Sequence, residues 1–211
     1  LNTLDRLEPE TSEAYDLGYR YNGGTFIASA TGWFNSFEDR IERTFDIVSG
    51  DTGSFNAGDI TLWGADFEAG WQATEALALI GTASYKKSDI GASPIANIEG
   101  RSLYDTPEWT FAARAEYTVG NFDMGIQARY VDERFTNLIN DETTPSYTVV
   151  DANVRWNFGR LVGQDGAYLQ LNVVNLFDEE YLGNISTDIG GNRSAQVGAP
   201  RTFLATIRTE F

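Results

Sequence analysis

Apolar and polar residues alternate along several stretches of this chain, and the final stretch is the clearest. One parity carries Phe203, Ala205, Ile207, Thr209 and Phe211, and the other carries Thr202, Leu204, Thr206, Arg208 and Glu210. Because successive side chains of a strand point to opposite faces, the pattern predicts a strand with one apolar and one polar face. About ten residues is also the length that a tilted strand needs to cross a bilayer.

Eight earlier segments share this period, so about nine strands are predicted in all. They are Tyr15–Tyr21, Phe26–Phe34, Thr61–Trp71, Leu77–Tyr85, Trp109–Tyr117, Phe122–Tyr130, Val150–Phe158 and Leu169–Val173. The second segment is less regular, because Trp33 falls on its polar side. If these strands cross a membrane, two sets of positions should face opposite ways. We expect lipid-facing side chains at Ala113, Ala115, Ile126, Ala128, Ala152 and Val154, and side chains facing the barrel interior at Arg114, Gln127, Arg129, Asp151, Asn153 and Arg155.

The connections between these segments alternate between short and long. The short ones are Asn22–Gly24, Gln72–Ala76, Val119–Asn121 and Gly159–Gly166, and the long ones are Glu42–Gly58, Ser88–Pro107, Glu133–Ser146 and Asp178–Pro200. Aromatic residues stand at both ends of the apolar stripes, for example Trp71 and Trp156 beside short turns and Trp109 beside a long loop. Alternating loop lengths and two aromatic girdles are typical of an outer-membrane β-barrel with short periplasmic turns and long extracellular loops.

A soluble β-sandwich is the competing interpretation, because its strands also alternate. Its buried stripes favour Val, Ile, Leu and Phe, whereas these stripes combine terminal aromatics with central Ala, Gly and Leu. Nine strands are an odd number, and free strand edges are not viable in lipid. We therefore expect residues 1–211 to be the C-terminal part of a larger all-β, antiparallel up-and-down transmembrane barrel.

Composition narrows the possible functions. The chain has 15 Lys and Arg against 31 Asp and Glu, a net charge of −16, which argues against a nucleic-acid partner. It contains neither Cys nor His, so thiolate metal sites, disulfides and His-dependent catalysis are excluded. No apolar run reaches 18 residues, so no transmembrane helix is predicted.

Four motifs resemble those of TonB-dependent outer-membrane receptors. Leu7–Tyr19 is similar to the family's L-x-P-E-x-S-x-x-Y-E-x-G segment, and Asn56–Glu68 resembles its N-x-G and G-x-E-x-E strand. Asn172–Tyr181 resembles N-x-x-N-L-F-D-x-x-Y before the last loop, and Gly198–Arg201 resembles the G-x-P-R entry into the final strand. The sequence departs from the family at Thr209, where a bulkier apolar residue is more common.

The resemblance implies a 22-stranded barrel in the outer membrane of a Gram-negative bacterium, closed by an N-terminal plug. It implies TonB-dependent uptake of a scarce ligand, such as a ferric siderophore, haem, cobalamin or an oligosaccharide. The expected partners are outer-membrane lipid, the plug, the remaining strands and, through the plug, TonB. A passive porin or structural barrel is the alternative function. We expect no enzyme activity, cofactor or metal, and the sequence does not identify the ligand-binding residues.

Some polar residues could carry chemistry, but a polar barrel wall explains them better. Asp66 and Glu68 lie about 6–7 Å apart along one strand face, a spacing that glycosidase carboxylates also use. Pairing with arginine or contact with a plug accounts for them more simply. Asp51, Asp141, Glu142, Asp178, Glu179 and Glu180 are acidic loop residues without EF-hand spacing, so we interpret them as solvated charge. Acidic loops would disfavour strongly anionic ligands.

Overall fold

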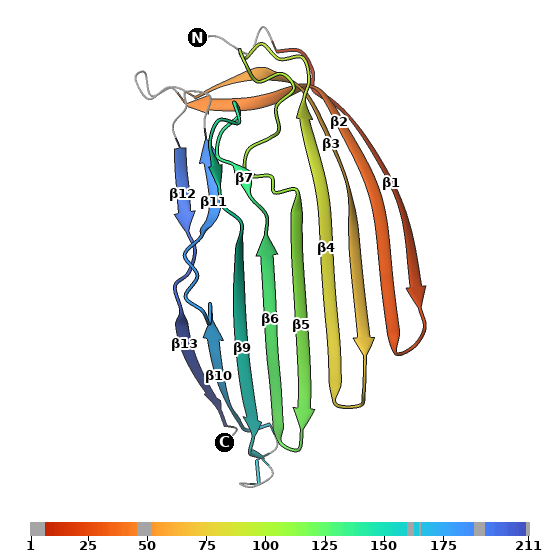
Figure 1. The fold of residues 1–211 in the computed structure, drawn as a ribbon, viewed down its shortest axis with the longest axis vertical. Helices are drawn as coiled ribbons and strands as arrows, with labels where there is room; N and C mark the ends of the chain where they lie inside the picture. The colour runs from red at the N-terminus through yellow and green to blue at the C-terminus, as the bar shows by residue number, and fades with distance from the viewer. Residues whose placement is uncertain (1–6, 46–51, 160–162, 165, 188–192, 210–211) are drawn as a thin grey trace.

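One antiparallel sheet of nine strands forms the body of the computed structural model, which describes residues 7–45, 52–159, 163–164, 166–187 and 193–209 (Figure 1). The strand order is β1-β2-β3-β4-β5-β6-β9-β10-β13. The bounds are β1 Thr11–Asn22, β2 Phe26–Phe45, β3 Thr52–Gln72, β4 Leu77–Ile90, β5 Trp109–Val119, β6 Phe122–Val131, β9 Tyr147–Asn157, β10 Tyr168–Val174 and β13 Thr202–Arg208. Each strand pairs with the next one along the sheet, which confirms the up-and-down arrangement and all nine predicted strands.

Two small hairpins lie inside the long connections that the sequence pattern predicts as irregular. β7 (Arg134–Phe135) pairs with β8 (Thr143–Thr144), and β11 (Leu182–Thr187) pairs with β12 (Arg193–Val197). The predicted final strand ends at Arg208, and Glu210 and Phe211 lie outside the described residues.

The prediction of a long loop over Glu42–Gly58 is wrong for residues 42–45 and 52–58, which form strand, and residues 46–51 lie outside the described ranges. β2 and β3 remain paired from Phe26↔Trp71 up to Phe45↔Thr52, with a register shift near Arg40. Asp39, beside that shift, has a φ of 53°. The backbone ladder continues here without apolar alternation, because its hydrogen bonds join main-chain groups and need no particular side chain. β4 likewise extends to Ile90, beyond the predicted Tyr85.

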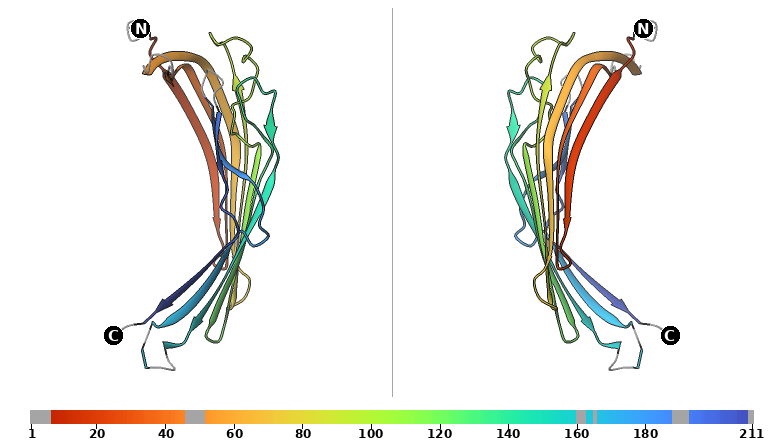
Figure 2. Two further views of the ribbon diagram at one scale, coloured as in Figure 1. Left: turned by 90° about the vertical axis from the view of Figure 1, so that its left-hand side faces the viewer. Right: turned by 90° about the vertical axis from the view of Figure 1, so that its right-hand side faces the viewer.

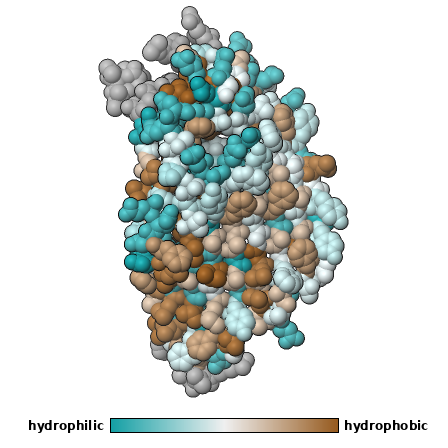
Figure 3. Space-filling view, viewed as in Figure 1, coloured by the Kyte–Doolittle hydropathy of each residue, from teal (hydrophilic) through white to brown (hydrophobic). Residues whose placement is uncertain are grey.

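The sheet is curved. In both views of Figure 2, β1 and β13 lie to the same side of the central strands, which bulge toward the viewer of Figure 1. Figure 3 shows this convex face, with apolar side chains gathered over its lower half and polar ones over its upper part. Alternation then places the polar parity on the concave face. Among the described residues, no helix has the length and hydrophobicity needed to cross a membrane.

Aromatic rings form a continuous row at the long-loop end of the apolar face. Neighbouring ring centroids are 4.7–5.8 Å apart along the series Trp63, Tyr85, Trp109, Phe111 and Tyr130. At the short-turn end, Tyr21 contacts Phe26, and Trp156 contacts both Phe122 and Phe158. These two rows match the girdles predicted from the sequence, which bound the apolar band of a membrane barrel.

Trp33 breaks the alternation of β2 for a local packing reason. The cross-strand partner of Trp33 is Gly64, on the polar face. A Cβ at Gly64 would lie 2.7 Å from the Trp33 ring and would also collide with the Tyr85 carbonyl oxygen. The glycine therefore makes room for an indole that an ordinary strand residue would displace.

Candidate functional site: the polar face and the loops above it

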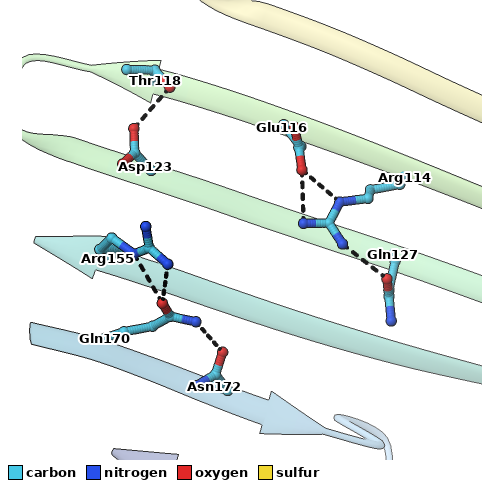
Figure 4. Close-up of polar contacts among 8 residues, drawn as sticks. All are labelled: Arg114, Glu116, Thr118, Asp123, Gln127, Arg155, Gln170 and Asn172. Carbon is cyan, nitrogen blue, oxygen red and sulfur yellow. Dashed lines mark hydrogen bonds and ion pairs between the residues drawn. The ribbon is translucent and has the colours of Figure 1, made fainter. Parts of the chain in front are cut away.

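Side chains of the concave face are joined in a line that crosses β5, β6 and β9. Arg114 forms an ion pair with Glu116 over 2.7 Å and donates a hydrogen bond to Gln127 over 3.3 Å (Figure 4). Gln127 in turn donates to Asp151 over 2.8 Å. The links from Arg114 to Gln127 and from Gln127 to Asp151 cross between strands, so they fix neighbouring strands relative to one another.

A second polar group lies nearer the short turns. Arg155 donates two hydrogen bonds to Gln170 Oε1, over 2.9 and 2.7 Å, and Gln170 donates to Asn172 over 2.7 Å (Figure 4). Asp123 accepts hydrogen bonds from Thr118 and Asn157 over 2.9 and 2.8 Å. These contacts place β5, β6, β9 and β10 in one hydrogen-bonded wall.

Arg114, Asp151 and Arg155 are each joined to a neighbouring strand through a glutamine amide. The Arg114–Glu116 pair lies within β5, and Asp151 and Arg155 have amide partners. The amides of Gln127 and Gln170 bridge the strands because an amide can both donate and accept. Asp66, considered above as a paired carboxylate with Glu68, accepts a hydrogen bond from Ser84 over 2.5 Å.

The registers place the six residues predicted for the interior on one face. Arg114, Gln127 and Asp151 are directly opposite one another on consecutive strands, as are Asp123 and Arg155. Arg129 and Asn153 share the parity of their neighbours on β6 and β9. The six residues predicted for lipid occupy the other parity.

A hollow of about 320 Å³ opens on the concave face below the long loops. Its lining includes Ile80, Thr82, Arg114, Arg129, Asp151 and Tyr181. Arg129 is exposed and makes no ion pair or hydrogen bond with any residue that the structure describes. Tyr181 comes from the last long loop, and its ring stacks on Tyr147 of β9 with centroids 4.4 Å apart. The hollow therefore combines an aromatic wall, an exposed guanidinium and a carboxylate.

The Asn172–Tyr181 motif closes the base of the last loop through one buried amide. Asn175 is 1% exposed and has a φ of 53°, in the left-handed region that Asn tolerates. Its Nδ2 donates to the Glu179 and Ala199 carbonyls, each over 2.9 Å, and its Oδ1 accepts from the Glu179 N–H over 2.8 Å. Its own N–H donates to Asp151 over 2.8 Å, which joins the loop to the polar face.

The Gly198–Arg201 motif packs against this first motif. Asp178 accepts a hydrogen bond from the Arg201 N–H over 2.8 Å, and the Gly198 N–H donates to the Tyr181 carbonyl over 2.8 Å. A Cβ at Gly198 would collide with the Tyr181 ring. The two motifs thus hold the start and the end of one loop together and orient Tyr181 toward the hollow.

Three of the acidic loop residues have individual partners. Asp141 accepts a hydrogen bond from Asn137 over 2.6 Å, Glu142 forms an ion pair with Arg193, and Asp178 lies 3.7 Å from Arg201. The described residues contain no group of three or more acidic side chains placed to hold a metal ion. Asp51 lies outside them.

Comparison with known proteins decides the family. A family model described as "TonB dependent receptor-like, beta-barrel" matches residues 2–176. The chain belongs to this family of receptor barrels. The nine-stranded sheet is therefore barrel wall of the outer membrane, as the motifs and the two aromatic rows indicate.

Two curated relatives illustrate the similarity. A ferrioxamine receptor from Yersinia enterocolitica is 28% identical over 209 residues, which cover 97% of this chain and 28% of that protein. A ferrichrome outer membrane transporter and phage receptor from Escherichia coli K12 is 26% identical over 211 residues, covering 96% of this chain and 27% of that protein. The chain thus spans less than a third of the length of either relative.

A solved structure supports the fold. The ferric yersiniabactin uptake receptor FyuA from Yersinia pestis superposes with a TM-score of 0.78 at 19% identity, covering 96% of this chain and 30% of that one. At this identity the likeness concerns the fold alone.

Proposed function

We propose that this chain supplies nine wall strands and the long extracellular loops of a TonB-dependent receptor for a ferric siderophore. The curated relatives that match nearly its full length are named for ferrioxamine, ferrichrome and catecholate siderophores, and this carries the proposal. The hollow under the loops, lined by Tyr181, Arg129 and Asp151, supports a binding role for this part of the wall. The remaining strands, an N-terminal plug and TonB are the proposed partners.

In this arrangement the four short turns face the periplasm and the long connections face the medium. The ligand would first contact the loops and then the concave polar face, where the plug would also lie. The polar wall is suited to such contacts, because its amides and the exposed Arg129 can bind a changing set of polar groups.

Uptake by the full-length receptor tests the function. Cells that express it as their single siderophore receptor should accumulate iron from one of iron-loaded ferrioxamine B, iron-loaded ferrichrome or a ferric tris-catecholate, and inactivation of TonB should abolish uptake. Uptake that persists without TonB and scales linearly with ligand concentration would indicate a passive porin instead.

Loop deletion tests the orientation. Removing the β11–β12 hairpin should weaken ligand binding by intact cells, because Tyr181 enters the hollow from that loop. Altering the β5–β6 turn at Gly120 and Asn121 should leave binding unchanged. If the turn alters binding and the loop does not, the proposed orientation is inverted.

A further inference from the structure

Three loops that are distant in the sequence meet at one buried arginine above the polar face. Arg134 of β7 is 3% exposed. Its Nε donates to Asp105 Oδ1 over 2.5 Å, and its Nη2 donates to the Leu182 carbonyl over 2.7 Å. Asp105 belongs to the β4–β5 connection, and Leu182 begins the β11–β12 hairpin. One guanidinium therefore joins three of the long connections.

Asp105 reinforces the same junction from the other side. Its Oδ2 accepts a hydrogen bond from the Ile185 N–H over 3.1 Å, and its own N–H donates to the Phe135 carbonyl over 2.9 Å. The carboxylate is thus shared between Arg134 and the hairpin backbone. Charge-assisted hydrogen bonds of this kind are about twice as strong as neutral ones.

Further contacts join the same loops independently. Asn140 accepts a hydrogen bond from the Ser102 N–H over 2.7 Å and donates one to the Ser102 carbonyl over 2.9 Å. Arg193 forms an ion pair with Glu142 and lies 3.4 Å from the Thr136 hydroxyl. We call residues 102–106, 134–144, 182–187 and 193–197 together the loop cluster.

The junction also reaches the hollow. The Arg134 guanidinium lies 5.6 Å from the centre of the Tyr147 ring, and Tyr147 is the ring on which Tyr181 stacks. Tyr181 lines the hollow beside Arg129 and Asp151. The position of Tyr181 is therefore set both by the motifs below it and by Arg134 beside it.

We propose that Arg134 is a positioning residue that holds the loop cluster as one rigid unit and thereby fixes Tyr181 as a wall of the ligand-binding hollow. Truncation of Arg134 would leave the Asp105 carboxylate without its cation and the Leu182 carbonyl without its donor. A partly buried charge without its partner is strongly destabilising, so all three loops would loosen together. The rigidity of the loop cluster is independent of the proposed function, whereas the role of Tyr181 in ligand binding rests on it.

Amide exchange tests the rigidity in the full-length receptor. Arg134→Met and Asp105→Asn should each accelerate exchange in 182–187 and 193–197 by about tenfold or more. Arg101→Met is the matched control, because Arg101 is an exposed arginine of the same β4–β5 connection whose side chain makes no hydrogen bond with described residues. Unchanged exchange in an Arg134→Met protein that still migrates as a heat-modifiable barrel would overturn the proposal.

Arg134→Lys covers the case in which Arg134→Met fails to assemble. Lysine keeps the charge but lacks the fork that reaches Asp105 and Leu182 at once, so exchange should accelerate to an intermediate extent. Exchange equal to that of the wild type in Arg134→Lys would show that charge alone holds the loops and would overturn the role of the fork.

Ligand binding tests the positioning role, with iron-loaded ferrioxamine B, iron-loaded ferrichrome and a ferric tris-catecholate as probes. Arg134→Met should weaken binding by about tenfold, mainly through faster dissociation, and Arg101→Met should not. Tyr181→Ala should reproduce this loss, and Tyr181→Phe, which keeps the stacked ring, should restore binding. Faster exchange with unchanged affinity would refute the positioning role. A wild-type receptor that binds none of the probes refutes the proposed function, while the exchange result still decides the rigidity.

Discussion

At the scale of single residues, Ala112 and Ala113 make the two-faced character of the wall directly measurable. They are neighbours in β5, and their cross-strand partners are Arg129 on the polar face and Ala128 on the apolar face. Ala113→Arg should lower the free energy of unfolding by about 2–4 kcal/mol if it lies near the bilayer midplane. Ala112→Arg should cost about 1 kcal/mol at most, since its side chain enters a polar, hydrated space and meets only the like charge of Arg129 opposite. Denaturant unfolding of the receptor in lipid vesicles provides both values, and equal costs would contradict the assigned faces.

Asn175 is the residue whose replacement should damage the last loop most. Asn175→Ala removes both donors and the acceptor that hold Glu179 and Ala199, and it places alanine at a positive φ. We expect a loss of about 3 kcal/mol from the free energy of unfolding. Asn172→Ala serves as the control. It removes one hydrogen bond, which Asn172 accepts from Gln170, and should lower the free energy of unfolding by about 1 kcal/mol or less. Similar values for the two variants would show that the amide of Asn175 does not hold the loop.

At the scale of strands, Gly64 tests how β2, β3 and β4 fit together. Gly64→Ala would force its Cβ against the Tyr85 carbonyl and the Trp33 ring, so we expect a loss of about 1–3 kcal/mol. Gly32→Ala is the matched control, because its Cβ would meet only the Gly64 carbonyl oxygen, 4.0 Å away. The midpoint of thermal unfolding, measured with a heat-modifiability assay, distinguishes Gly64→Ala from Gly32→Ala. Equal midpoints would contradict the close packing at Gly64.

The strands also show how much of the fold and of the site could be predicted from the sequence. The two-residue period identified all nine wall strands, because one face of each must be apolar. It missed the upper β2–β3 hairpin, where the backbone ladder continues without an alternating pattern. The link between Ile185 and Asp105 joins positions 80 residues apart, so no local signal predicts it. The Asn175 junction was recognisable as a motif, but its hydrogen bonds were not.

At the scale of the whole molecule, the wall is organised as two zones with different sources of order. Between the aromatic rows, the backbone ladder and bridging amides such as Gln127 and Gln170 hold the strands. Above the rows, individual side chains hold the loops, chiefly Arg134 and Asn175, both buried. Substitutions in the first zone should therefore affect barrel assembly, and those in the second should affect loop order while the barrel persists.

The open sheet leads to the last prediction. The strand order begins at β1 and ends at β13, and these two strands do not pair with each other. Their free N–H and C=O groups would cost several kcal/mol each in lipid, so this chain expressed alone should not form a barrel that resists SDS. Co-expression with the remainder of the receptor as a separate polypeptide should restore a heat-modifiable species, because both edges then find partner strands. A stable, SDS-resistant barrel formed by the 211 residues alone would show that β1 and β13 can close on each other and would refute the larger wall proposed here.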